Sequence, residues 1–160
     1  MPTNPSGLSD EHRVKARDLT IRAAHLGLKR QASLQYTQGS ERWQGIDKNL
    51  KAWQGECPTR ADCSAFATWC LWNGLDHFGV RDTVNRQQWK AGYTGTMFEH
   101  GVKVSRPFRA DLVLYGDPFG RSGHVALYVG GGMVISFGGE PGPRLLPINY
   151  RPVTALRRAV

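Results

Sequence analysis

The sequence predicts one α+β domain, in which helices come first and an antiparallel sheet follows. Helical segments are indicated over about residues 10–30, from Cys63 to Gly74 and over 82–92, and short runs rich in Val, Leu and Tyr, separated by Gly, Pro and Asp, follow them. Helices followed by strands are typical of α+β proteins. The chain has 160 residues, of which 40% are hydrophobic, so it can bury a core. We expect a single domain over residues 1–160, with the Pro- and Gly-bearing residues 1–9 as a flexible start.

The first half should hold helices around one long loop. Ser9 or Asp10 can cap a helix over about 10–30. Residues 36–60 lack a clean period, which predicts an ordered loop with at most a short helix. A second helix should begin near Cys63 and end at Asn73-Gly74, and a short helix fits residues 82–92. The apolar stripe of the first helix consists of Val14, Leu19, Ile21, Ala24, Leu26 and Leu28.

The second half predicts an antiparallel sheet of about five or six strands. Apolar runs occupy residues 101–105, 110–116, 124–130, 132–138 and 153–159. Three consecutive glycines, 130–132, predict a tight hairpin between two of these runs. The Pro- and Gly-dense stretch that closes the chain should wrap the sheet as an ordered tail and end in a strand.

The charge favours an anionic partner without naming one. The formal net charge is +8, but the basic residues are scattered and no run of five or six occurs. No zinc-finger or RNA-recognition signature is present, so nucleic acid is not an expected partner. The sequence contains no stretch of about 18 apolar residues, so no membrane insertion is expected. The polar N-terminus lacks an apolar signal-peptide core, so we expect synthesis in the cytoplasm without a secretory signal.

The stretch "TRADCSAFATWCLW", residues 59–72, raises the question of what Cys63 does. The spacing of the three cysteines, C-x5-C-x6-C, is not a zinc spacing, and no metal site is expected. A Cys57–Cys70 disulfide is disfavoured by the missing export signal. Cys63 should sit at the positive end of a helix, which lowers a thiol pKa and makes it the reactive candidate. Cys70, two turns further on, should behave as a small hydrophobe.

A thiolate nucleophile needs a histidine that takes up its proton and protonates the leaving amine. Of the five histidines, His124 opens the run "HVALYV" directly after the flexible "FGRSG", so a sheet fixes it at its edge. His12 and His25 lie on the first predicted helix, and His77 and His100 lie in loop-like surroundings. The residues alone leave open whether Cys63 and His124 form a catalytic pair or Cys63 is structural.

Two motifs in order carry a resemblance to a known family. "DCSAF" at residues 62–66, followed by "DLVLYG" and "GHVALYVGGGMVIS", resembles the NlpC-type cell-wall cysteine peptidases, a papain-like family, and the likeness spans roughly residues 34–137. It implies Cys63 as nucleophile and His124 as general base. The third catalytic residue, usually a histidine, falls on Ser136, which is a departure. Ser136, a backbone carbonyl or Glu140 could therefore orient the base.

The resemblance also implies residues that bind substrate. Tyr36 matches a tyrosine ahead of the nucleophile, and Asp62 and Ser64 match the residues that flank it. In relatives that read a free amino terminus, the aspartate faces that amine. Arg81 loosely matches a family arginine. The residues "RAD", 109–111, replace the usual Pro-Gly-Asp before the central strand. Asp111 is retained, and we expect its side chain to stabilise a turn.

By this resemblance the chain is a cysteine endopeptidase that cleaves stem-peptide amide bonds of bacterial peptidoglycan, most often between D-glutamate and the diamino acid. The expected enzyme is monomeric and needs no cofactor, and the backbone N–H of Cys63 stabilises the oxyanion. Alternatives on this fold are an N-acetylmuramoyl-L-alanine amidase, an amide-forming transferase, and an inactive domain that binds wall peptides. A phage endolysin released through a membrane pore fits the missing signal, and a bacterial toxin delivered by a secretion system is the alternative.

Overall fold

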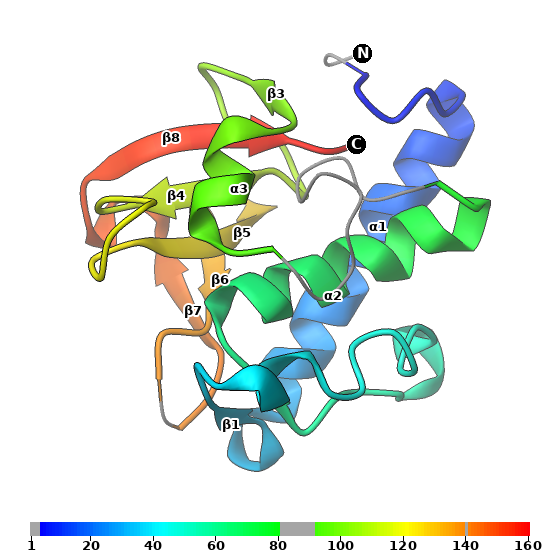
Figure 1. Ribbon diagram of the computed structural model, residues 1–160. Helices are drawn as coiled ribbons and strands as arrows, with labels where there is room; N and C mark the ends of the chain where they lie inside the picture. Colours follow the sequence, from blue (N-terminus) through cyan, green and yellow to red (C-terminus); the bar gives the residue numbers. More distant parts are fainter. Residues whose placement is uncertain (1–3, 81–91, 140) are drawn as a thin grey trace.

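An antiparallel sheet of six strands forms one layer of the protein, here described from a computed structural model that covers residues 4–80, 92–139 and 141–160 (Figure 1). The spatial order is β3-β8-β4-β5-β6-β7, so the last strand of the chain lies inside the sheet. The strands are β3 (Val102–Lys103), β4 (Leu112–Tyr115), β5 (His124–Gly130), β6 (Met133–Ser136), β7 (Arg144–Pro147) and β8 (Val153–Arg158). The predicted α+β class, with five or six antiparallel strands, is confirmed.

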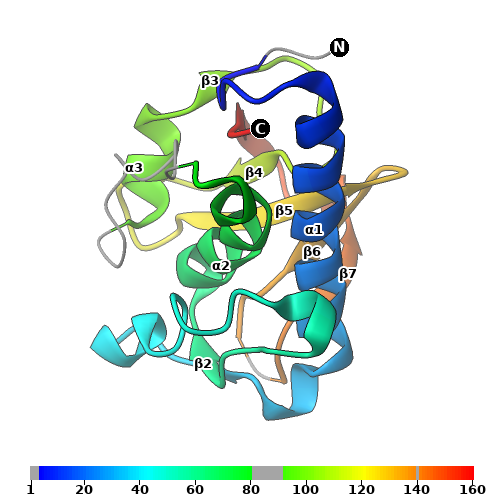
Figure 2. The ribbon, with the colours of Figure 1, turned by 90° about the vertical axis from the view of Figure 1, so that its right-hand side faces the viewer.

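Within the described residues, three α-helices accompany the sheet: α1 (Asp10–Lys29), α2 (Cys63–Leu75) and α3 (Thr94–Glu99). Helices α1 and α2 lie side by side in front of the sheet in Figure 2 and share one hydrophobic core with it. That core takes alternate strand residues such as Leu112, Leu114, Val125 and Leu127. A smaller cluster around Val113, Tyr115 and Ala126 covers the opposite face. Both faces of the central strands are therefore buried, which explains their nearly continuous apolar sequences.

The two long helices pack closely because each presents a glycine to the other. A Cβ at Gly27 would collide with the Phe66 ring, and one at Gly74 with the Ala16 carbonyl oxygen. Most of the predicted apolar stripe of α1 packs as expected: Leu19 and Ala24 are buried, and Ile21, Leu26 and Leu28 lie partly buried against the core. Val14 is the exception, at 51% exposed, and the small residues Ala16, Thr20 and Ala23 complete the buried face. Gly74 was also predicted to end α2, but it lies inside the helix, where it permits this approach.

The expected loop over residues 36–60 is ordered and holds only short elements. The 3-10 turns Ser40–Trp43 and Ala52–Gln54 interrupt it, and Trp43 and Ile46 anchor it in the main core. At its ends β1 (Gln35–Tyr36) pairs in parallel with β2 (Arg60–Ala61). This pairing places Tyr36 beside Ala61, one residue before the start of the Asp62–Cys63 motif.

Two elements of the second half were not predicted. Helix α3 has one turn and a half and is capped by the hydroxyl of Thr96, which accepts from the Tyr93 N–H at 3.0 Å. Strand β7 lies in the Pro- and Gly-dense tail and pairs with β6 at the sheet edge. The glycine hairpin between β5 and β6 is confirmed: Gly130, Gly131 and Gly132 have φ of 98°, 62° and 76°. The helix expected over residues 82–92 lies almost wholly outside the described residues.

Asp111 forms the turn that its sequence position suggested, and it also forms a buried ion pair with Arg158. Its Oδ2 accepts from the Phe108 N–H at 2.7 Å, closing the turn before β4. Arg158 on β8 donates to both of its carboxylate oxygens, from Nε at 2.8 Å and from Nη2 at 2.7 Å. Ala110 stands where the family pattern has glycine and has φ 73°, the only positive φ among the described non-glycine residues.

Candidate active site

Cys63 is the first residue of α2, and Asp62 caps the helix. The Asp62 Oδ1 atom accepts from the Ala65 N–H at 2.8 Å and from the Ser64 hydroxyl at 2.9 Å. An aspartate in this position satisfies an N–H that has no partner within the helix and complements the helix dipole. The sequence motif Asp-Cys-Ser is therefore also a capping motif, and it fixes the backbone of Cys63.

The Cys63 thiol does not have the lowered pKa that its helix position predicted. Burial, and after it the charge of Asp62, raises this pKa from 9.0 to about 12, while backbone hydrogen bonds from Val125 and Ser64 oppose the rise. Cys63 is 6% exposed, so loss of hydration outweighs the helix terminus. The prediction of a lowered pKa for Cys63 was wrong. The Val125 contact nevertheless puts the thiol beside the residue that follows His124.

His124 is the first residue of β5, and its imidazole is held by Ser136 on β6. The Nε2 atom lies 2.6 Å from the Ser136 hydroxyl, and both side chains are buried. Ser136 pairs with Ala126, two residues beyond His124, so the contact is a diagonal one between neighbouring strands. The residue that the family resemblance matched to the third catalytic position thus contacts the imidazole directly.

The surroundings of His124 favour a neutral ring. Tyr115, its direct partner on β4, stacks on the imidazole with 6.0 Å between ring centroids and an interplanar angle of 29°. Burial, followed by the charge of Arg151, lowers the pKa of His124 from 6.5 to about 4. Near neutral pH both the Cys63 thiol and the imidazole are therefore uncharged in the free protein.

Tyr36 lies near Cys63, as the resemblance implied. Burial, followed by the charge of Cys63, raises the pKa of the phenol, and Gln38 donates to its hydroxyl at 3.1 Å. The ring is edge-on to Phe137, which follows the last residue of β6, at 5.2 Å. The tyrosine is thus held between the nucleophile motif and the strand that carries Ser136.

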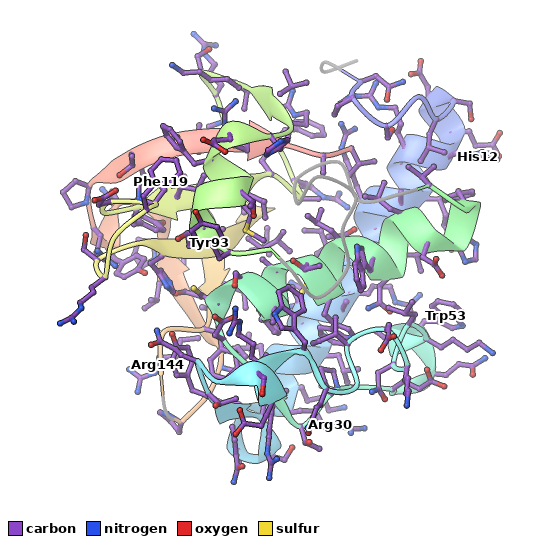
Figure 3. The ribbon with its side chains drawn as sticks, viewed as in Figure 1. His12, Arg30, Trp53, Tyr93, Phe119 and Arg144 are labelled. Atoms are coloured by element: carbon purple, nitrogen blue, oxygen red, sulfur yellow. The ribbon has the colours of Figure 1, made fainter. Side chains whose placement is uncertain are left out.

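A cavity of about 520 Å³ opens over the start of α2. Asp62, Cys63 and Ser64 line it from the start of α2, and Tyr93 and Phe119, labelled in Figure 3, line it from the segment before α3 and from the β4–β5 connection. Its remaining lining residues are Gln38, Thr94, Gly120, Arg121 and Gly123. The candidate nucleophile therefore faces a space large enough for part of a peptide.

A sequence model of the NlpC/P60 family matches residues 51–141, which is more than half of the chain and includes Cys63, His124 and Ser136. This chain belongs to the NlpC/P60 family. No curated protein matches it. The family resemblance that the motifs suggested is confirmed.

Solved structures of NlpC/P60 proteins share the fold. NlpC1 from Trichomonas vaginalis matches with a TM-score of 0.55 and 20% identity over 88% of this chain, which spans 44% of the length of that protein. The NlpC/p60 domain of the peptidoglycan hydrolase SagA matches with a TM-score of 0.55 and 18% identity, over 89% of this chain and 97% of that one. RipD from Mycobacterium tuberculosis, a non-catalytic NlpC/p60 domain protein adapted to peptidoglycan binding, matches with a TM-score of 0.54 and 20% identity, over 91% and 98%.

The NlpC/P60 family thus includes a peptidoglycan hydrolase and a non-catalytic domain that binds peptidoglycan. Fold and family membership alone do not distinguish the two, because both structures match this chain about equally well. The residues at the site have to decide between catalysis and binding.

Arg42 is a site residue that the sequence did not reveal. Its Nε lies 3.4 Å from the second carboxylate oxygen of Asp62, and its Nη1 donates to the Gln38 carbonyl at 2.8 Å. One Asp62 oxygen is thus used by the helix cap and the other faces a cation, so the amine-reading role implied for Asp62 has a competitor. No motif marks Arg42, which lies 20 residues before Asp62 and reaches it only in the folded chain.

The remaining candidates are placed elsewhere or lie outside the described residues. Arg81 and Glu140 belong to the latter group. His12 stacks on Phe78, and His77 is edge-on to Trp53 (both His12 and Trp53 are labelled in Figure 3). Cys57, Cys63 and Cys70 are all described and free of disulfides. Over the described ranges, no three His, Cys, Asp or Glu residues group as a metal site, and no helix is long and apolar enough to cross a membrane.

Proposed function

We propose that this chain is a cysteine endopeptidase that cleaves stem-peptide amide bonds of bacterial peptidoglycan. The observation that carries the proposal is the contact of His124 Nε2 with the Ser136 hydroxyl at 2.6 Å. His124 opens β5, and the second residue of that strand, Val125, contacts the Cys63 thiol. Ser136 contacts Nε2, so Nδ1 is the ring nitrogen that acts as the base when Ser136 accepts from Nε2–H. Any buried histidine needs a hydrogen-bond partner, so what favours catalysis is that the ring so held lies at the start of the strand whose next residue contacts the Cys63 thiol.

The reaction begins from a neutral thiol and a neutral imidazole. The Nδ1 atom of His124 takes the thiol proton as the sulfur attacks the scissile carbonyl carbon, and the imidazolium then gives that proton to the departing amine. The resulting thioester on Cys63 is hydrolysed by water, which His124 activates in the same way. The backbone N–H of Cys63, at the start of α2, stabilises the oxyanion in both steps.

The family and the surface of the site support the proposed substrate class. The cavity over Cys63 is lined by the polar residues Gln38, Ser64, Tyr93 and Thr94 beside Phe119, which suits a peptide with short side chains. The net charge of +8 suits a polymer that bears carboxylates and phosphates. In this proposal the enzyme acts as a lysin, and the bond between D-glutamate and the diamino acid is the expected point of cleavage.

A non-catalytic domain that binds wall peptides is the second candidate. The observation that favours it is the resting state of the site: the pKa of Cys63 is raised to about 12 and that of His124 lowered to about 4, so no thiolate–imidazolium pair is pre-formed. The hydroxyl of Ser136 also carries no charge that would stabilise an imidazolium. Under this candidate Tyr36 and Asp62 contact the peptide and no bond is cut.

Mass spectrometry of purified peptidoglycan after incubation with the protein separates the two candidates. The peptidase proposal predicts new soluble fragments whose masses show one stem-peptide amide bond hydrolysed. A sedimentation assay with the same peptidoglycan measures binding in parallel. Retention on the wall without any new fragment would establish the binding domain instead, and fragments cut between sugar and peptide would establish an amidase.

A further inference from the structure

The hydroxyl of Ser136 cannot by itself decide which nitrogen of His124 carries the proton. A serine hydroxyl can accept from an N–H or donate to a bare ring nitrogen, whereas a carboxylate can only accept. If Ser136 accepts from Nε2–H, Nδ1 is free to act as the base. If Ser136 donates to Nε2, Nδ1 carries the hydrogen and cannot take the thiol proton. The direction of this one hydrogen bond therefore determines whether the site is competent.

A second hydroxyl lies on the far side of Ser136. The phenol oxygen of Tyr150 is 3.3 Å from the Ser136 hydroxyl oxygen. Ser136 is 4% exposed, and it lines a cavity of about 220 Å³ together with Tyr150 and Arg144 (labelled in Figure 3). A hydrogen turned away from His124 can therefore go to the Tyr150 phenol or to water in this cavity. Among the described residues, Tyr150 is the partner found for it, and the phenol's own hydrogen can reach water in the same cavity.

Tyr150 is held in this position by the residues that surround His124. It ends the 3-10 turn Ile148–Tyr150, whose Ile148 carbonyl accepts from the Tyr115 hydroxyl at 2.7 Å. The Tyr115 ring stacks on His124 and lies 5.1 Å from the Tyr150 ring. The Ile148 N–H donates to Gly132 in the β5–β6 hairpin at 2.9 Å. The same tyrosine thus supports the imidazole face and the turn that presents Tyr150.

We propose that Tyr150 is a positioning residue that accepts a hydrogen bond from Ser136 and so turns the Ser136 lone pair toward Nε2–H of His124. The chain of donors runs from Nε2 to Ser136, from Ser136 to Tyr150 and from Tyr150 to water in the cavity. A carboxylate gives this polarity in one step, and here two neutral hydroxyls in series give it. The catalytic consequence rests on the proposed function, but the state of the imidazole does not.

Nitrogen NMR of the labelled imidazole tests the proposal without any substrate. At pH 7 the wild-type protein should hold His124 mainly as the Nε2–H tautomer, and Tyr150→Phe should move the tautomer ratio toward Nδ1–H by about two- to tenfold, the effect of one neutral hydrogen bond. Tyr128→Phe removes a hydroxyl that serves the hairpin, where it accepts from the Gly132 N–H at 3.0 Å, and should leave the ratio unchanged. An unchanged ratio in a folded Tyr150→Phe variant would overturn the proposal.

Hydrolysis kinetics test whether Tyr150 acts through Ser136. Tyr150→Phe should lower kcat by about two- to tenfold and leave KM unchanged, and it should cost nothing further in a Ser136→Ala background. Equal losses in both backgrounds would mean that Tyr150 acts by another route, which contradicts the proposal. A wild-type protein that cuts no peptidoglycan would end the proposed function alone, because the NMR measurement would still decide the role of Tyr150.

Discussion

His124 combines a buried ring, a neutral partner and a nearby cation, and this combination sets the pH range in which it can act as a base. Its pKa is lowered to about 4, so above that pH the imidazole is neutral and can take a proton. For the proposed peptidase, kcat/KM should therefore stay on a plateau as the pH falls from 7 to 5, and decline only near pH 4. The pH dependence of the initial rate checks this. An acid limb near pH 6.5 would show that the ring is not in the environment described.

Ala110 adopts a backbone conformation that suits glycine. At φ 73° an L-residue crowds its own carbonyl, at a cost of about 1–2 kcal/mol, and the matching family position is glycine. We expect Ala110→Gly to raise the free energy of unfolding by about 0.5–1 kcal/mol in urea denaturation. Ala126→Gly, in the middle of an extended strand, is the control and should lower it. Similar losses in both variants would refute the strain interpretation.

At the residue scale, short sequence motifs predicted where the site residues lie on helices and strands, but they did not predict how buried or charged their surroundings are. The motifs around Cys63, His124 and Ser136 lie in contiguous sequence, and capping and strand pairing act over a few residues, so their placement was readable. The raised pKa of Cys63 was not, because burial depends on segments far away in the chain. Arg42 and Tyr150 were missed for the same reason: each contacts its partner only through the fold.

Helix–helix packing depends on Gly74, which brings α2 against α1. A methyl group there would meet the Ala16 carbonyl, part of a helix backbone that cannot turn aside. Gly74→Ala should lower the free energy of unfolding by about 1–3 kcal/mol, even though alanine is the better helix former. Denaturation of both variants compares it with Gly131→Ala in the hairpin, where no atom lies within 4 Å and only the positive φ opposes the substitution. A more stable Gly74→Ala protein would show that the helices are not in close contact.

At the scale of elements, runs of apolar residues revealed the strands β4, β5 and β6, and helical spacing revealed α1, whereas α3 and β7 were missed. Length alone does not explain the difference, because β7 has four residues, as β4 and β6 do, but three of its four residues are exposed. Helix α3 spans Thr94–Glu99 and owes its start to a cap, and β7 has prolines at and near its ends. An edge strand such as β7 can tolerate proline because it pairs on one side only, so its sequence resembles that of a loop.

A buried ion pair joins β8, near the end of the chain, to the turn before β4. Asp111 is fully buried and Arg158 is 5% exposed, and they form two hydrogen bonds. Asp111→Ala should cost about 3–5 kcal/mol in urea denaturation, because it leaves the Arg158 charge buried without its partner. The double variant Asp111→Leu with Arg158→Met should cost less than the two single losses added together. Strict additivity would show that the two charges do not interact.

The architecture and the family of the whole molecule were predictable because they depend on the order of the elements and on two motifs that follow each other in the expected order along the chain. What the sequence could not supply is whether the site works, since that depends on a proton position within a buried cluster. Cys63 and Cys70 lie on one helix and are both buried, but only Cys63 borders the cavity over α2. They therefore form a matched pair for testing the central claim.

The release of new amino groups from purified peptidoglycan by wild-type, Cys63→Ala and Cys70→Ala proteins tests that claim most directly. Cys70→Ala truncates a core side chain and should cost on the order of 1 kcal/mol of stability. It should nevertheless release amines at close to the wild-type rate under conditions where it is folded. Cys63→Ala, equally folded, should release none. Release at the wild-type rate by a folded Cys63→Ala protein would contradict the account.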